Sequence, residues 1–266
     1  MEKGVTFIKK QPKENLIYDK DAANHKKIAV IFDYDCSDED EHCYTGEFLI
    51  ISPKYIFKAG GFESIFMGNT PREYPPVLLA ALGLIYDIYK EDTSKHLPRC
   101  FEGYDLTKAM QILAGNKAER KSDIKRFFQA AAFLMELDED EMKEKAKEEL
   151  ENITEGYEFN VRYTNRLFLV GTKDIMLGLL SDIKKDRKKE LAAARFYKSV
   201  VDICLYICKD LRELHGIRKI LLSGKMFDED ENLCALIPQL VRSGFEVEKG
   251  KYQAYTRVVY EGIANK

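Results

Sequence analysis

The chain has 266 residues, with 42 Lys and Arg against 45 Asp and Glu and a net charge of −3. A composition of 45% hydrophobic and 33% charged residues is typical of a globular protein with a core and excludes a disordered chain. The nearly balanced charge argues against a nucleic-acid partner bound through a broad basic surface. We therefore expect an ordinary globular protein that binds no nucleic acid.

Neither a membrane span nor a secretory signal is expected. The longest mostly apolar run, Val77–Tyr89, is interrupted at Asp87 and is shorter than the roughly 20 residues that a bilayer requires. The first residues include several lysines but no apolar core of a signal peptide. We expect no membrane partner and a cytoplasmic location. Scattered cysteines in such a chain predict free thiols: Cys36, Cys43, Cys100, Cys204, Cys208 and Cys234.

In chain order, the first third predicts strands, because short β-branched or aromatic runs are separated by Gly, Pro or acidic turns. These strands are Val5–Lys9, Lys27–Asp33, Glu47–Ser52, Tyr55–Lys58 and Phe62–Met67. A helical block follows, where apolar residues recur at helical spacing. Its helices are Val77–Tyr89, Asp105–Ala114, Ser122–Met135 and Asp138–Ile153.

The last part alternates strands and helices. Extended stretches are expected at Tyr157–Val161 and Leu167–Val170, then a helix Lys188–His215, a strand Lys219–Leu222, a helix Glu229–Arg242, a strand Phe245–Glu248 and a helix Ala254–Ala264. This order predicts an α/β domain with an inserted helical subdomain.

Two groups of residues resemble metal or catalytic sites, but a structural role is the preferred interpretation for both. The acidic loop from Asp33 to Cys43 fails as an EF-hand, because Asp38 and Tyr44 stand where the loop requires Gly and Glu. Its Cys and His residues lack the spacing of a metal site, so a solvated turn is the preferred interpretation. Cys204 and Cys208 lie four apart on one helix face, which favours core packing. No serine or cysteine nucleophile motif is present, so a self-contained hydrolase is not expected.

The segment Ile217–Asp228 carries a stronger signal. An apolar strand leads into Ser223-Gly224 and then into a helix, so backbone N–H groups at this turn can face an anion or nucleotide. Many α/β folds use such a turn for structure alone.

Three blocks in this part of the chain resemble the carboxy-terminal part of the HypF family of hydrogenase-maturation carbamoyltransferases. Leu191–Asp202, Gly216–Phe227 and Leu240–Val247 are similar, in order and spacing, to the family's Ala-Ala-Arg-Phe-His-Asn-Thr, Leu-Ser-Gly-Gly-Val-Phe and Ala-Gly-Phe-Glu-Val. Upstream, Ile28–Asp33 and Tyr44–Leu49 resemble Val-Ala-Phe-Asp and Trp-Gly-Gly-Glu-Phe-Leu. The resemblance extends from about Lys27 to the end.

The resemblance implies an RNase-H-like α/β lobe of the actin-like ATPase superfamily, in which two lobes enclose a nucleotide. It predicts a lobe at 27–70 and 155–266, a helical insert at 71–154, and a segment 1–26 as a remnant of the first lobe or an added strand. It also implies ATP or another adenine nucleotide as the one possible cofactor. The residues that would contact it are Ser223, Gly224, Lys225, Asp33 and Asp35.

This chain departs from the family pattern at the positions where the family binds metal or contacts phosphate. The family's His-His-His-Ala-His would lie over Lys13–Ile17, where no histidine occurs, so we expect no bound metal. Asp-Gly-Thr-Gly is replaced by Asp33-Tyr34-Asp35-Cys36, whose side chains hinder close approach of a phosphate to the backbone. Gln129 replaces a carboxylate, and Lys225 replaces a glycine. Lys225 could either contact a phosphate or cap the turn in solvent. Packing residues, by contrast, survive: Val30, Phe32, Phe48, Phe127, Phe196, Leu221, Leu222, Phe227 and Phe245.

Three hypotheses about function follow. The preferred one is a non-catalytic or regulatory homologue, a pseudoenzyme that acts through protein partners. The alternative is the nucleotide-binding half of a split carbamoyltransferase whose first lobe is a separate chain. A third is an unrelated activity on the same scaffold. We expect the inner face of the lobe to be covered by a second copy in a homodimer, by a first-lobe partner, or by Val5–Tyr18.

Overall fold

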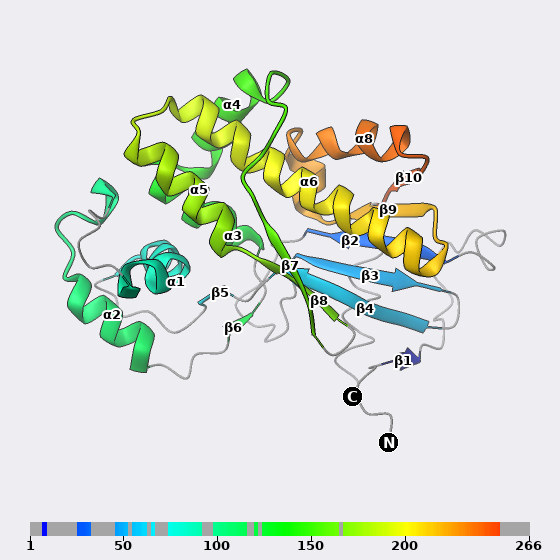
Figure 1. Cartoon of the computed structure of the whole chain (residues 1–266), viewed down its shortest axis with the longest axis horizontal. Helices are drawn as coiled ribbons and strands as arrows, with labels where there is room; N and C mark the ends of the chain where they lie inside the picture. The colour runs from blue at the N-terminus through cyan, green and yellow to red at the C-terminus, as the bar shows by residue number, and fades with distance from the viewer. Residues whose placement is uncertain are drawn as a thin grey trace. The chain divides into compact units, whose positions relative to one another are not determined.

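The computed structural model describes residues 7–9, 26–32, 46–52, 55–62, 65–66, 74–91, 98–115, 120–121, 124–164 and 167–250 (Figure 1). The chain forms two compact units. The first consists of Met1–Gly61, Val161–Val170 and Val201–Lys266, and the second of Phe62–Asn160 and Gly171–Val200. The lobe boundaries expected from the family stay a prediction. The expected helix Ala254–Ala264 and the acidic loop lie outside the described residues.

The first unit is built on an eight-stranded sheet in the order β10-β9-β2-β3-β4-β8-β7, with β1 also paired to β4. The strands are β1 (Phe7–Lys9), β2 (Lys27–Ile31), β3 (Glu47–Ile51), β4 (Tyr55–Phe62), β7 (Asn160–Thr164), β8 (Leu167–Gly171), β9 (Lys219–Ser223) and β10 (Glu246–Lys249). Strands β2, β9 and β10 are parallel, whereas β3 is antiparallel to both β2 and β4. This is the strand arrangement of an RNase-H-like α/β lobe, which the resemblance to the HypF family implies.

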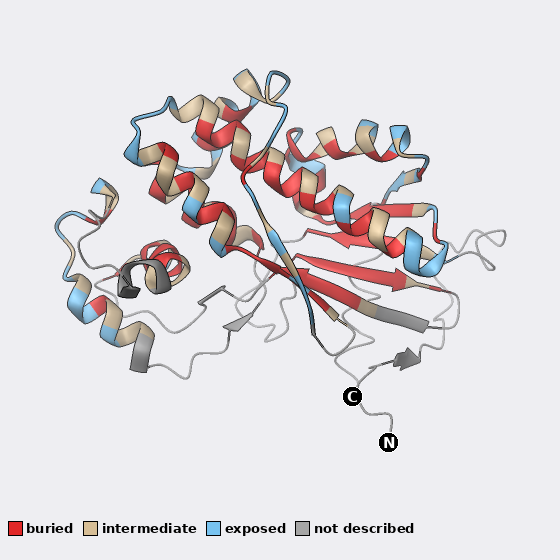
Figure 2. Ribbon diagram, viewed as in Figure 1, coloured by how far each residue is buried: buried red, intermediate tan, exposed pale blue. Residues whose placement is uncertain are grey.

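The centre of this sheet is buried on both faces, because its strands are nearly continuous runs of apolar residues. Figure 2 shows β2, β3 and β9 almost wholly buried. On one face Ala29, Ile31, Leu49 and Leu221 form a cluster. Elsewhere in the unit, the rings of Phe32 and Phe227 stack with centroids 5.0 Å apart. Across both units, the nine packing residues shared with the family pattern, from Val30 to Phe245, are all buried, as expected.

The helices of the first unit follow β8 in the chain. They are the second half of α6 (Lys189–His215), α7 (Lys225–Glu229), the 3-10 turn η3 (Leu233–Ala235) and α8 (Leu236–Arg242). The prediction of one helix over Glu229–Arg242 is wrong. Asp230 is extended, with φ −118° and ψ 102°, and its carboxylate accepts a hydrogen bond from Asn232 N at 3.0 Å. This local bond competes with a continuous helix.

The second unit is mainly helical. It contains α1 (Pro76–Glu91), η2 (Arg99–Phe101), α2 (Leu106–Gly115), α3 (Ile124–Leu134), α4 (Glu139–Glu149), α5 (Lys173–Lys184) and the first half of α6, with a small sheet of β5 (Ile65–Phe66) and β6 (Arg120–Lys121). Asp138 and Glu141 form a capping box that fixes the start of α4. Helix α5 lies in a stretch for which no helix or strand is predicted from the sequence. None of the described helices is long and apolar enough to cross a bilayer.

Candidate functional site

The turn after β9 has a backbone that requires glycine. Strand β9 ends at Ser223, α7 begins at Lys225, and Gly224 between them has φ 112° and ψ 153°. This conformation is almost confined to glycine, because a Cβ atom would collide with the backbone. The turn is bonded directly to the end of β2, since Phe32 N donates to Ser223 O at 2.9 Å and Met226 N donates to Phe32 O at 3.2 Å. It therefore lies at the carboxyl edge of parallel strands, where α/β proteins bind ligands.

The Ser223 hydroxyl is buried, with 1% of the residue exposed. Its Oγ has no hydrogen-bond partner among the residues that the structure describes. A buried hydroxyl without a partner costs about 1–3 kcal/mol, so such atoms are uncommon outside functional sites. The turn thus presents a polar atom that suits a hydrogen-bonding ligand. Asp33 and Asp35, the other expected contacts, lie outside the described residues.

Lys225 is the first residue of α7 and is partly exposed. Its Nζ lies 3.7 Å from Glu229 Oε1, one turn along the same short helix. Exposed pairs of this kind contribute only about 0.3–0.5 kcal/mol. The structure therefore gives the lysine a carboxylate partner that an incoming anion could replace at little cost.

A buried carboxylate, which the sequence analysis did not single out, lies on the same row of the sheet. Ile31 of β2 is paired with Ser223 on one side and with Glu47 of β3 on the other, so all three side chains point to one face. Glu47 is 2% exposed, and its carboxylate forms an ion pair with Lys58 of β4. The signal that could have found it is a charged residue opening an apolar strand.

Gln129, which replaces a carboxylate of the family pattern, has a structural role in the second unit. Its Oε1 accepts from Arg126 Nη1 at 3.1 Å, and its Nε2 donates to Glu139 Oε2 at 3.3 Å. Burial raises the pKa of Glu139, and the bond from Gln129 partly offsets that rise. The amide therefore joins α3 to the start of α4.

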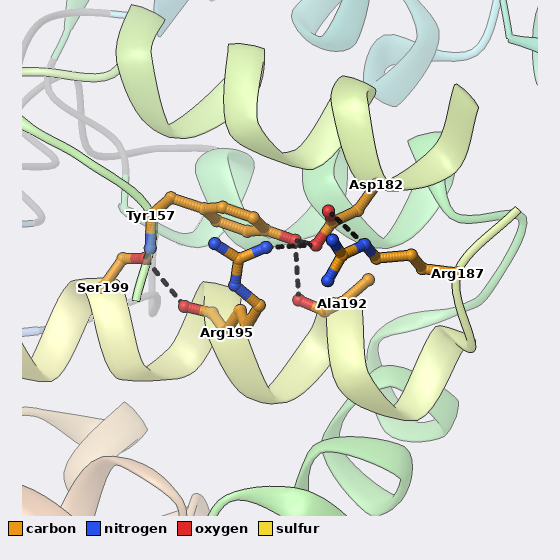
Figure 3. Close-up of polar contacts among 6 residues, drawn as sticks. All are labelled: Tyr157, Asp182, Arg187, Ala192, Arg195 and Ser199. Carbon is orange, nitrogen blue, oxygen red and sulfur yellow. Dashed lines mark hydrogen bonds and ion pairs between the residues drawn. The ribbon is translucent and has the colours of Figure 1, made fainter. Parts of the chain in front are cut away.

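A second polar cluster surrounds Asp182 in the same unit (Figure 3). The buried carboxylate of Asp182 accepts from Tyr157 Oη at 3.0 Å and Arg195 Nη1 at 2.7 Å, and Arg187 Nε lies 3.2 Å away. The Arg195 guanidinium also lies over the Tyr157 ring, 4.5 Å from its centroid. Tyr157 N donates to Ser199 Oγ at 2.6 Å. These partners satisfy one another, so the cluster holds the segment before β7 against α5 and α6.

The described residues can be compared with the ligands that a metal ion requires and with the hydrogen-bond donors that an anion requires. No three His, Cys, Asp or Glu residues in the described ranges are placed to hold a metal ion. Cys204 and Cys208 are buried free thiols whose pKa values are raised by burial, in agreement with the predicted core role. The described residues do not fit a bound metal. The unpartnered Ser223 Oγ and the Gly224 backbone do fit the phosphate of a nucleotide.

Comparison with known proteins identifies relatives of this chain. The family model described as "Carbamoyltransferase, Kae1-like Domain, second subdomain" matches residues 30–252. A solved structure of full-length HypF in the phosphate- and nucleotide-bound form is 23% identical, with a TM-score of 0.70 over 85% of this chain and 36% of that one. HypF of T. kodakarensis is 15% identical, with a TM-score of 0.64 over 86% of this chain and 31% of that one. The chain thus spans about a third of the length of these structures. No curated protein sequence gives a significant match.

Proposed function

The chain belongs to the family of the Kae1-like carbamoyltransferase domain, second subdomain, and from this membership we propose that it is a diverged, non-catalytic homologue of the HypF carbamoyltransferase domain. It acts in a regulatory role through a protein partner. The observation that carries the proposal is the use of Gln129 in a structural bridge. An amide that already accepts from Arg126 and donates to Glu139 supplies neither the negative charge nor the proton acceptor of a carboxylate.

The substitution at Lys225 supports the same conclusion. Where the family pattern has a second glycine after the serine, this chain places a long side chain that pairs with Glu229. Catalysis of group transfer from phosphates depends on donors held in place before the reaction. A lysine side chain that already has a carboxylate partner is a poor substitute for a backbone that a phosphate can approach closely.

A second candidate function is the nucleotide-binding half of a split carbamoyltransferase. It is favoured by the unpartnered Ser223 Oγ and the Gly224 conformation, and one of the matched HypF structures is described as phosphate- and nucleotide-bound. In this candidate the Ser223 hydroxyl donates to a ligand oxygen, and Lys225 exchanges Glu229 for a phosphate. A bound ATP would supply the adenylyl group to which the carbamoyl group is joined, with pyrophosphate as the leaving group.

The test of the proposal is carbamoyl-phosphate-dependent ATP–pyrophosphate exchange by the purified chain. We expect no exchange above a blank without protein. Reproducible exchange that is abolished by Ser223→Ala or Gly224→Val would show that the chain is catalytic and would overturn the proposal. Addition of a candidate first-lobe protein that restores exchange would instead establish the split enzyme.

Calorimetry with ATP separates a ligand role of Ser223 from a purely structural one. In the split-enzyme candidate, Ser223→Ala weakens ATP binding about tenfold, yet leaves thermal stability unchanged or slightly higher, because it removes a hydroxyl without a described partner. Ser243→Ala, after the end of α8, is the matched control and should alter neither property. An absence of heat at millimolar ATP for the unsubstituted chain would leave the turn a structural role only.

A further inference from the structure

The sheet of the first unit ends at β10 on one side and at β7 on the other, among the strands that the structure describes. A strand at the end of a sheet has unpaired backbone N–H and C=O groups along its outer side, and these can pair with another strand unless charges or bulges prevent it. Three of the four residues of β10 are charged and exposed: Glu246, Glu248 and Lys249. The β10 end is therefore protected in the way that natural sheets usually are.

Strand β7 has less of this protection. Its sequence, Asn-Val-Arg-Tyr-Thr, contains one charged residue, and the valine, tyrosine and threonine are residue types that favour strands. Asn160, Arg162 and Tyr163 are exposed, and Figure 2 shows the strand exposed over most of its length. No described strand pairs with its outer side. The backbone of β7 is thus available to a further strand.

Exposed apolar side chains gather beside this end of the sheet. Of the six large hydrophobic residues that are exposed in the described part of the chain, four lie on β7, on its neighbour β8 and on the second half of α6: Tyr163, Leu169, Tyr206 and Leu214. Tyr206 and Leu214 share one side of α6, and Asp210 between them accepts a hydrogen bond from the Tyr163 hydroxyl, which places this side of the helix next to β7. Large apolar residues that gather on one part of a surface mark an interaction site, whereas single scattered ones do not. We call β7, together with Leu169, Tyr206 and Leu214, the β7 surface.

We propose that the β7 surface is the interface of a homodimer, in which β7 pairs antiparallel with β7 of a second copy of the chain. A two-fold axis through such a pair sets the surface against itself, so the exposed apolar side chains of both copies are covered at once. Because the β10 end is charged, each copy offers one open strand, and assembly stops at two chains.

The sequence of β7 suits pairing with itself. Residues that lie opposite each other in an antiparallel pair point to the same face of the sheet. A register centred on Arg162 would set two guanidinium groups opposite each other, and like charges in that position are destabilising. Registers centred on Val161 or on Tyr163 keep the two arginines apart and place identical apolar side chains opposite each other. The strand therefore has two registers in which a second copy is a favourable partner.

The first experiment is sedimentation equilibrium of the full chain at micromolar concentrations. We expect a concentration-dependent dimer with twice the chain mass of 30.7 kDa. Tyr163→Lys should raise the Kd of the dimer about tenfold or more, because two ammonium groups replace two rings at the interface, while the lysine remains a partner for Asp210. Leu214→Ser should raise the Kd about threefold to fivefold through loss of apolar burial. Leu177→Ser and Val241→Ser, at exposed apolar residues outside the β7 surface, are matched controls and should leave the Kd unchanged.

Cross-linking locates the interface and its register. Residues opposite each other in an antiparallel pair have Cα atoms about 4.5–5.5 Å apart, so a short bis-maleimide can join two cysteines at such a position. Val161→Cys should give the larger yield of covalent dimer in the register centred on Val161, and Tyr163→Cys in the register centred on Tyr163. Val241→Cys is the control and should give no more covalent dimer than the unsubstituted chain, whose own cysteines set the background. Circular dichroism establishes that each variant is folded.

Three outcomes would overturn the proposal. The first is a monomer at every concentration tested, and the second is an assembly that grows beyond two chains. The third is a dimer that neither Tyr163→Lys nor Leu214→Ser weakens and that neither β7 cysteine cross-links, which would assign dimerisation to a different surface. Dimerisation does not depend on whether the chain is catalytic. Exchange activity is measured separately, so failure of the non-catalytic proposal is distinguishable from failure of the dimer interface.

Discussion

Removal of one hydroxyl from the Asp182 cluster tests whether the segment before β7 depends on that cluster for its order. Tyr157 is 4% exposed in a stretch, 153–159, that contains neither helix nor strand. Its hydroxyl lies 3.0 Å from Asp182 Oδ2 and 3.3 Å from the carbonyl oxygen of Ala192. Tyr157→Phe removes these bonds and keeps the ring, which packs closely on Gly178 and beneath the Arg195 guanidinium.

The structure sets the expected size of the effect. A hydrogen bond to a charged group contributes about 1.5–3 kcal/mol to stability. Asp182 keeps its ion pairs with Arg187 and Arg195 in the variant, so no buried charge is left alone. We therefore expect Tyr157→Phe to lower the free energy of unfolding by about 2 kcal/mol, in the lower half of that range.

The assay is urea denaturation at pH 7, followed by far-ultraviolet circular dichroism. Tyr74→Phe is the matched control, because the buried Tyr74 hydroxyl donates at 3.0 Å to the neutral carbonyl oxygen of Asp105. It should cost about 1 kcal/mol. Asp182→Asn combined with Tyr157→Phe should cost less than the sum of the single changes, since Asp182→Asn removes the charge from the same hydrogen bond that Tyr157→Phe deletes. A loss below about 0.5 kcal/mol for Tyr157→Phe, or one no larger than that of Tyr74→Phe, would show that the hydrogen bond to Asp182 does not stabilise this segment.

Two further predictions concern the first unit and the buried thiols. Gly60→Ala should destabilise the chain by about 3 kcal/mol or more, because the added Cβ would lie 2.3 Å from the carbonyl oxygen of Phe168. The control Gly216→Ala should cost only about 1 kcal/mol, since the added Cβ meets open space and only the φ of +70° is unfavourable. Equal losses of stability in the two variants would contradict this prediction. Burial raises the pKa values of Cys204 and Cys208, so these thiols stay protonated in the folded chain and ionise first in the unfolded one. The unfolding free energy should therefore fall as pH rises above about 9, by up to about 1.4 kcal/mol per pH unit for each thiol, and less steeply in Cys208→Ala. A slope unaffected by Cys208→Ala would argue against this cause.

Local sequence pattern alone is enough to predict several of the strands and helices. Strands β2, β3 and β9 and the helix α6 begin and end within two residues of their predicted bounds, because apolar runs and a long helical period specify them without reference to the rest of the chain. The resemblance to HypF was also found on short blocks, such as Gly216–Phe227, and the family match confirms it. Phe127 and Phe196 were predicted to be buried from residue type alone, and both are.

Tertiary structure decided the features that depend on distant residues. No helix is predicted over α5, whose Gly178 lowers helix propensity. The glycine is needed because the ring of Tyr157 packs against it. The break in the predicted helix at Asp230 follows from a bond of its own side chain. The row that joins Ser223 to Glu47 exists only through the register of three strands. Register is a long-range property, because the pairing of whole strands and the burial of their apolar faces set it, and no local window of sequence contains both partners.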